Sequence, residues 1–293
     1  MFLSRHHSRP VALIAVLLSF LLAACEEEPR RRVTSEPARE LSALLYEGKT
    51  SSDVDAKSIE TLLGDDLRPG LEATLIKDPD GTMLVVSARL ALLEPGLRGV
   101  TADNPEGAVP DDMLRDDALA LLIGSGFVSE LMALSPLGLL QVNGEVVNRI
   151  ERHGYTRVLG IADQRMGVVG HLQYERGLFH SALQVGPGVI EGGKVDISPR
   201  DLERQPFFRS LVGTCADQSI FVTSLSPMHL HAMGNALLKF AAKKQLTCDE
   251  VVNLAGDREA IMALRFADGR VLFIGNPRTS RSAVVTLESI PAA

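Results

Sequence analysis

Residues 251–264 read "VVNLAGDREAIMAL", and this stretch sets the pattern of the fold. Two apolar runs of the strand type flank five residues, 255–259, that combine a glycine with three charged side chains. Short apolar runs bounded by glycine and charged residues are typical of strands joined by tight connections. The stretch therefore predicts two consecutive strands. It also raises the question of whether the charged loop is a functional site, a site that has lost its function, or only a solvent-exposed turn.

The same alternation recurs along the chain. Hairpin turns are predicted at residues 78–81, 143–144 and 267–270, where a glycine can adopt a positive φ. One long helix is predicted at about 227–245, with Ser226 as its N-cap and apolar residues at helical spacing. The sequence thus predicts an α+β fold: a mixed, largely antiparallel sheet with hairpins, and the long helix packed on it.

The N-terminus has the composition of an export signal. A basic start precedes an almost unbroken apolar run at 11–22, which ends in Leu-Ala-Ala-Cys. This order is typical of a secretory signal, and the run is short for a membrane span. Because the cysteine follows Leu-Ala-Ala directly, as in a bacterial lipobox, we interpret residues 1–24 as a lipoprotein signal peptide and Cys25 as the lipidated residue. An ordinary signal peptide with an incidental cysteine is the alternative.

The sequence after the predicted signal peptide consists of a predicted flexible tether followed by one predicted domain. Residues 25–39 are rich in charge and proline and poor in apolar side chains, which is typical of a flexible tether. Residues 40–293 suit a single domain, with a short helical lead-in at 40–66. Acyl chains on Cys25 would anchor this domain to a membrane on the periplasmic side of the cell envelope. The sequence leaves open which membrane holds the anchor.

Composition excludes several classes of function. The composition does not favour nucleic-acid binding. The net charge is −7, there is no tryptophan and there are only three tyrosines, whereas nucleic-acid-binding proteins typically have basic surfaces and aromatic side chains for stacking. We find no complete Gly-x-x-x-x-Gly-Lys-Ser/Thr phosphate loop and no Gly-x-Ser-x-Gly elbow, and we predict no cofactor. The scattered histidines and two remaining cysteines lack metal-ligand spacing, so we predict no metal. Cys215 and Cys248 either form one disulfide or remain buried thiols.

Three glycine-rich points follow apolar runs and are predicted at strand ends. Glycine at such points lets the backbone approach a ligand closely or form an anion-binding nest. Arg209, just before the run "SLVG", could pair with a phosphate held there. Each point taken alone is more typical of a tight turn than of a binding site. The three points are Gly124-Ser125-Gly126, Gly186-Pro187-Gly188 and Ala255-Gly256-Asp257.

Taken in order, these segments resemble the phosphodiester glycosidase family, whose members hydrolyse sugar-1-phosphodiesters. The resemblance spans residues 71–287 and implies a sugar-phosphate ligand. It is carried by "GSGFV" from Gly124, "PLGLLQVNGEVV" from Pro136, "ALQVGPGVIEGGK" from Ala182, "RSLVG" from Arg209 and "NLAGDRE" from Asn253. The binding residues that it implies are Gly124, Ser125, Gly126, Gly186, Asn253, Gly256 and Arg258.

The chain departs from the family pattern where polar groups are expected. Gly124 stands in place of an asparagine, and Ala255 stands in place of the aspartate of the Asp-Gly-Gly-Gly-Ser signature. Ala255 can neither transfer a proton nor attack. Asp257 or Glu259 would have to supply a displaced carboxylate beside Arg209, but catalysis is intolerant of ~1 Å errors in position.

Two main functions follow from this comparison. The first is an exported lipoprotein whose phosphodiester glycosidase-like domain has diverged from hydrolysis and binds a glycan or a protein partner in the envelope. The second is an active hydrolase of a glycosyl phosphodiester, with Asp257, Glu259 and Arg209 as catalytic residues. A purely structural lipoprotein subunit is a third possibility. The hydrolase requires that Gly124, Arg209 and Asp257 meet at one cleft.

Overall fold

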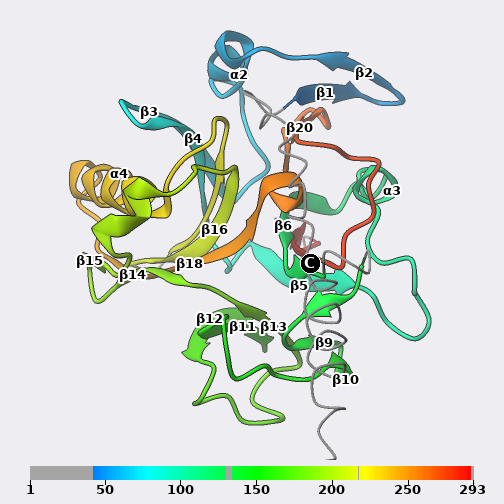
Figure 1. Cartoon of the computed structure of the whole chain (residues 1–293). Helices are drawn as coiled ribbons and strands as arrows, with labels where there is room; N and C mark the ends of the chain where they lie inside the picture. Colours follow the sequence, from blue (N-terminus) through cyan, green and yellow to red (C-terminus); the bar gives the residue numbers. More distant parts are fainter. Residues whose placement is uncertain (1–41, 130–133, 217, 292–293) are drawn as a thin grey trace, which may run out of the picture. The chain divides into compact units, whose positions relative to one another are not determined.

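The computed structural model describes residues 42–129, 134–216 and 218–291, all within the unit Ala38–Ala293 (Figure 1). The predicted signal peptide, the lipidated Cys25 and the tether lie outside the described residues. In the described ranges, no helix has the length and apolarity needed to cross a membrane.

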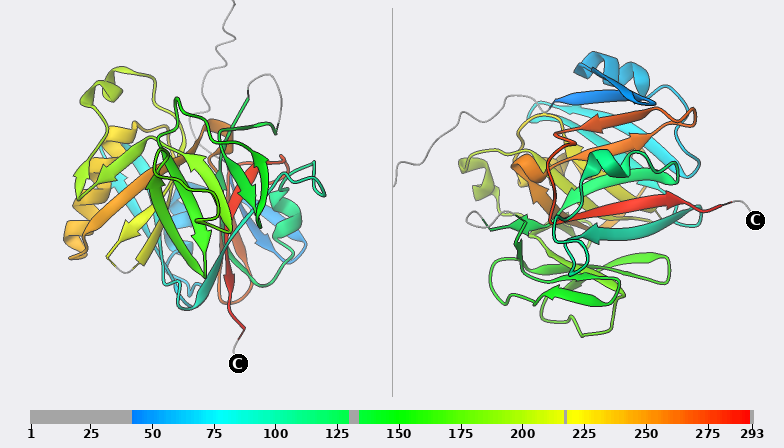
Figure 2. Two further views of the ribbon diagram at one scale, coloured as in Figure 1. Left: turned by 90° about the horizontal axis from the view of Figure 1, so that it is seen from below. Right: turned by 90° about the vertical axis from the view of Figure 1, so that its right-hand side faces the viewer.

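Sheet 1 contains seven antiparallel strands in the order β2-β1-β20-β19-β6-β21-β5. Figure 2 shows the last of these in sequence, β21, in red beside β5. The strands are β2 (Thr50–Asp53), β1 (Ala43–Glu47), β20 (Val271–Ile274), β19 (Met262–Arg265), β6 (Leu119–Ser125), β21 (Ala283–Ser289) and β5 (Leu93–Gly99).

Sheet 2 contains seven further antiparallel strands and sheet 3 contains five. In order, sheet 2 consists of β15 (Lys194–Val195), β14 (Gly188–Glu191), β18 (Cys248–Gly256), β16 (Arg209–Cys215), β17 (Gln218–Ser224), β4 (Gly81–Ala88) and β3 (Leu71–Asp78). Sheet 3 consists of β10 (Glu145–Asn148), β9 (Leu140–Val142), β13 (Ser181–Val185), β11 (Arg157–Ala162) and β12 (Arg165–Gly170). A separate hairpin pairs β7 (Phe127–Val128) with β8 (Pro136–Leu137).

The predicted α+β class is wrong. Strands account for 48% of the structure and helical residues for 13%, so the fold is mostly antiparallel β-sheet. The described α-helices are short: α2 (Ala56–Leu62), α3 (Pro110–Met113) and α4 (Leu230–Lys243). Two 3-10 helices, η2 (Pro199–Glu203) and η3 (Asp257–Glu259), complete the helical elements of the described ranges.

The helix predicted at 227–245 is shorter at both ends because other contacts take its terminal residues. Before the helix, Met228 exchanges two backbone hydrogen bonds with Phe207, so His229 becomes the N-cap. The hydroxyl of Ser226, the expected cap, instead accepts from the backbone N–H of Thr82 at 3.0 Å. At the far end, Gln245 adopts a positive φ of 57°, which a helix does not allow.

The helical lead-in predicted at 40–66 contains α2 but differs elsewhere, and so does the region 111–122, whose acidic start also predicts a helix. Residues 43–47 form β1, which pairs with β20 in sheet 1. Only residues 110–113 are helical in the second region, and residues 119–125 form the fully buried strand β6. A short apolar run with both faces buried has no period that separates strand from helix. The three predicted hairpin turns are confirmed, at β3–β4, β9–β10 and β19–β20.

The main hydrophobic core lies between the sheets. One cluster joins buried residues of all three, including Leu121 of sheet 1, Phe221 of sheet 2 and Leu159 of sheet 3. A second cluster packs α4 on sheet 2, where Met233 and Leu237 of the helix belong to the same cluster as strand residues such as Leu211. The sheets therefore form the frame, and α4 covers one face of sheet 2 (Figure 1).

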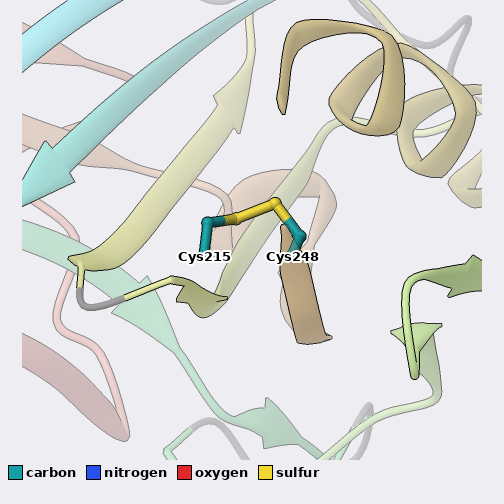
Figure 3. The surroundings of a disulfide bond; sticks show 2 residues. All are labelled: Cys215 and Cys248. Carbon is teal, nitrogen blue, oxygen red and sulfur yellow. A yellow bond between two sulfur atoms is a disulfide. The ribbon is translucent and has the colours of Figure 1, made fainter. Parts of the chain in front are cut away.

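A disulfide joins Cys215 to Cys248 (Figure 3). The two residues are partners in the register of β16 and β18, and both side chains are buried. Of the two alternatives left open by the sequence, the structure contains the disulfide. The bond fixes the end of the strand pair whose other end carries Arg209 and Gly256.

Candidate ligand-binding site

A pocket of about 490 Å³ opens where sheet 2, the β7–β8 hairpin and the loop before β11 come together. Its volume falls within the range of small-molecule sites, roughly 300–1,000 Å³. The lining mixes aromatic, cationic and amide side chains: Phe127, Gly154, Tyr155, Gly186, Pro187, Ile197, Ser198, Arg200, Asp201, Arg204, Gln205, Phe207, Arg209, Leu230 and Asn253.

Arg209 supplies a partly buried positive charge to this pocket. It begins β16 and lies opposite Gly256 of β18, where an added Cβ would come within 2.9 Å of the Arg209 Nη1 atom. Its guanidinium carbon lies 5.0 Å from the centre of the Phe207 ring. Burial lowers the pKa of Arg209, while the negative charges of Asp201 and Asp257 act in the opposite direction. Within the described ranges, its Nε atom is buried without a hydrogen-bond partner.

Asn253 supplies a buried amide. The residue is 1% exposed, and its Nδ2 atom donates to the Gly186 carbonyl at 3.3 Å. Backbone hydrogen bonds connect the same segments, from the Gly186 N–H to the Asn253 carbonyl and from the Asn253 N–H to the Pro187 carbonyl. Gly186 has a φ of 130°, which favours glycine. The Oδ1 atom of Asn253 is buried and has no hydrogen-bond partner among the described residues.

The η2 segment contributes a charged edge to the pocket. Asp201 accepts a hydrogen bond from the backbone N–H of His231 at 3.1 Å, which holds η2 against the first turn of α4. The same segment carries Arg200 and Arg204, whose side chains are exposed. Of the residues that line the pocket, Asp201 alone carries a carboxylate.

An aromatic pair lines another part of the pocket. The rings of Phe127 and Tyr155 are stacked, with centroids 4.5 Å apart and an interplanar angle of 20°. Phe127 belongs to β7 and Tyr155 to the loop before β11, so the stack joins two segments that are distant in the sequence. Burial raises the pKa of the Tyr155 hydroxyl, and the charge of Glu151 raises it further.

The structure brings together some of the residues predicted from the sequence. Arg209, Asn253 and Gly186 line one pocket, and Gly256 packs against Arg209. The lining does not include Gly124, Ser125 or Gly126.

The first glycine-rich motif is instead buried around β6. The N–H of Gly124 donates to the Ile261 carbonyl at 2.9 Å, and an added Cβ would lie 2.0 Å from the Glu259 carbonyl oxygen. Gly126 has a φ of 86°, and its N–H donates to the Leu254 carbonyl. These contacts give both glycines a role in close packing between strands.

The predicted catalytic carboxylates also lie outside the pocket lining. Glu259 is 8% exposed, and its carboxylate lies 3.3 Å from Nε of Arg281 and 3.3 Å from Nε of Arg258. Asp257 is exposed, with a φ of 55°, and its backbone N–H donates to the Phe208 carbonyl. The side chain of Arg258 is 67% exposed. The charged loop thus combines one buried ion pair with a solvated turn.

Sequence reasoning missed several residues of the pocket. Tyr155 sits in a loop without periodicity, and no local pattern marks it. The run "SPRDLER" at 198–204 is visibly charged, but a charged run is more often a solvated face. Only the fold brings Tyr155 and η2 to the same pocket as Arg209. Among the described residues, no group of three or more metal-ligating side chains could hold a metal ion.

Comparison with known proteins identifies a distant fold relationship. No protein-family model matches the chain, and no curated protein matches its sequence. The catalytic domain of zebrafish N-acetylglucosamine-1-phosphodiester alpha-N-acetylglucosaminidase, auto-inhibited by its pro-peptide, is similar with a TM-score of 0.54 and 14% identity. That match covers 77% of this chain and 87% of that domain. A hypothetical protein from Synechocystis gives a TM-score of 0.49 and 13% identity, over 75% and 62% of the two chains. The first likeness shows a shared fold.

Proposed function

We propose that this protein is a lipid-anchored envelope protein that binds a phosphate-bearing glycan in the pocket around Arg209 and has diverged from hydrolysis. The fold relationship to a phosphodiester glycosidase supports the class of ligand. The lipobox-like sequence at Cys25 supports the location.

One observation carries the proposal: a partly buried arginine and a buried asparagine, whose Oδ1 atom has no hydrogen-bond partner among the described residues, line the same pocket. Partial burial of the Arg209 charge is costly, the charges of Asp201 and Asp257 offset only part of that cost, and the Nε atom has no hydrogen-bond partner in the described ranges. A phosphate would supply that partner through charge-assisted hydrogen bonds. A sugar hydroxyl would supply the donor that Asn253 Oδ1 lacks. A phosphorylated sugar offers both groups in one molecule.

The position of the carboxylates favours binding over hydrolysis. Glycoside cleavage in most families uses a pair of carboxyl groups on either side of the scissile bond. Here Glu259 forms ion pairs with Arg281 and Arg258, and Asp257 does not line the pocket. Gly124 and Asp257 do not join Arg209 in the pocket, which is the arrangement that the predicted hydrolase required.

A hydrolase remains the second candidate because Asp201 does line the pocket. It would act alone, since no second carboxylate belongs to the lining. Its carboxylate already accepts a hydrogen bond from the His231 N–H.

Calorimetric titration of the purified full chain tests the proposal. The ligands are hexose 1-phosphates and the methyl phosphodiesters of the same sugars. Arg209→Ala should weaken binding by roughly 10- to 100-fold, because a hydrogen bond to a charged group contributes about 1.5–3 kcal/mol. The matched control is Arg115→Ala, whose side chain is 76% exposed and outside the pocket.

The same samples decide between binding and hydrolysis. The proposal expects the phosphodiesters to be recovered intact after prolonged incubation. Release of the free sugar by the wild type, abolished in Asp201→Asn, would establish the hydrolase instead. Binding that is equal in wild type and Arg209→Ala would overturn the anion site.

A further inference from the structure

We propose that Phe127 and Tyr155 form a second subsite of the pocket, which holds the pyranose ring of the ligand on an aromatic surface. The inference rests on the proposed function and assigns the residues that hold the sugar ring of its ligand. The two aromatic residues have no place in the anion site itself, which Arg209 and Asn253 already define.

The stack forms a fixed apolar surface. Both side chains are partly exposed and both line the pocket, so part of the stacked surface faces the ligand space. Offset stacking at 4.5 Å is a favourable arrangement for two aromatic rings. Large rigid side chains with few rotatable bonds provide contact area at low entropic cost. The stack therefore presents a surface that is formed before the ligand arrives.

The neighbouring backbone leaves this surface open. Gly154 directly precedes Tyr155 in the lining, and a Cβ added there would have no heavy atom within 4 Å. A ring can therefore lie at this part of the pocket without displacing protein atoms next to Gly154.

The polar groups of the pocket require a ligand with two kinds of hydrogen-bonding group. Arg209 donates and so requires an acceptor, which a phosphate provides. Asn253 Oδ1 accepts and so requires a donor, which a phosphodiester cannot provide because it has no O–H of its own. A pyranose has hydroxyl donors on its edge and apolar C–H groups on its faces. It thus meets the requirements of Asn253 and of the aromatic stack together.

Affinity ratios test this inference. The probes are α-hexose 1-phosphates, glycerol 1-phosphate as a linear phosphate with hydroxyl groups, and adenosine 5′-monophosphate as a phosphate with a different ring. We expect the wild type to prefer at least one hexose 1-phosphate over glycerol 1-phosphate by at least 10-fold. Tyr155→Ala should bring this ratio to within about 3-fold of unity, since base or ring stacking on an aromatic side chain contributes roughly 1–3 kcal/mol, or about 5- to 150-fold.

Two variants serve as controls. Tyr155→Phe keeps the ring and should keep the preference of the wild type. Leu172→Ala removes an apolar side chain that is 80% exposed and outside the lining, and should also leave the ratio unchanged. Thermal unfolding of each variant identifies any loss of fold. If Tyr155→Ala does not fold, Phe127→Leu provides the same test, because it removes the aromatic face while keeping an apolar side chain.

Each outcome supports or overturns the ring subsite. It is overturned if folded variants without the aromatic face keep the wild-type ratio, if no ring-bearing probe binds, or if the nucleotide binds more tightly than every hexose phosphate. Hexose phosphate binding that depends on Arg209 but not on Tyr155 would overturn the subsite alone. Binding of neutral methyl pyranosides that depends on Tyr155 but not on Arg209 would keep the subsite and overturn the proposed anion site.

Discussion

At Gly256, the absence of a side chain leaves room for the Arg209 guanidinium, whose Nη1 atom would lie 2.9 Å from an added Cβ. This glycine matches the family pattern while Ala255 beside it does not. Ala255 is fully buried in the main core, so its side chain is not available to a ligand. At this point the strand packs against the Arg209 guanidinium and carries no carboxylate.

The charged loop after Gly256 is explained by packing. Arg281 is fully buried, and its Nη atoms donate to the carbonyls of Thr279 and Arg258 at 2.9 Å. Glu259 pairs with the same guanidinium. Removing one partner of such a buried pair leaves an uncompensated charge. The Glu259 carboxylate therefore has a structural role as the partner of Arg281.

Gly124→Ala should destabilise the fold by ~1–3 kcal/mol, because the new methyl group would overlap the Glu259 carbonyl and strained packing has a cost of this size. Chemical denaturation measures the change. Gly167→Ala is the control, since a Cβ there meets no heavy atom within 4 Å and should leave stability within ~0.5 kcal/mol. Equal stability of Gly124→Ala and the wild type would contradict the packing role.

At the scale of elements, the strand pair β16–β18 carries Arg209 of the proposed anion site at one end and the disulfide at the other. The bond closes a loop with a sequence separation of 33 residues, which includes β17 and α4. A cross-link of this length stabilises mainly by limiting the unfolded chain.

Replacing both cysteines with alanine should reduce the free energy of unfolding by roughly 3–4 kcal/mol. Denaturation of the double variant, compared with the wild type under oxidising and reducing conditions, measures this. The reduced wild type should approach the double variant. If reductant has no effect on a wild type shown to be reduced, the stabilising role of the bond is wrong.

A second element-scale contact joins sheet 3 to sheet 2 behind the pocket. Arg157 of β11 lies 3.0 Å from the Glu191 carboxylate and 3.3 Å from the Glu250 carboxylate. Burial raises the pKa of Glu250, and the charge of Arg157 opposes the shift. The folded protein thus keeps this proton at pH values where the unfolded chain, with a glutamate pKa of ~4.3, has lost it. The contribution of Glu250 to stability therefore falls as pH rises from about 4 through its folded pKa.

Glu250→Gln should remove this pH-dependent loss. We expect the free energy of unfolding of the wild type, minus that of the variant, to decrease between about pH 4 and pH 7. Denaturation at a series of pH values measures the difference, with Glu175→Gln as the control for loss of an exposed carboxylate. A difference that rises with pH would show that Arg157 outweighs burial.

The elements also show how far the sequence determines the fold. The turn residues correctly predict the hairpins at 78–81, 143–144 and 267–270. These turns depend on a glycine with a positive φ, which is a property of the local backbone and needs no distant partner. The start of α4 and the strand at 119–125 depend on partners far away in the chain, such as Phe207 and β19. Likewise, Arg209 and Asn253 were predicted from the order of motifs, whereas Tyr155 and Asp201 reach the pocket only through the tertiary fold.

At the scale of the whole molecule, we propose that acyl chains on Cys25 attach the β-rich domain to a membrane. Cys25→Ala should prevent acylation and release the protein from the membrane fraction, because acyl chains provide the hydrophobic attachment. Fractionation and mass spectrometry of the N-terminal peptide measure this. If the variant remains in the membrane fraction to the same extent as the wild type, the anchor is not at Cys25.

The most direct test of the central claim is a crystal structure of the protein with a hexose 1-phosphate. The account predicts phosphate oxygens within hydrogen-bond distance of the Arg209 guanidinium and a sugar hydroxyl on Asn253 Oδ1, with the intact ligand in the pocket. A ligand bound elsewhere, or a phosphate that does not contact Arg209, would contradict the claim.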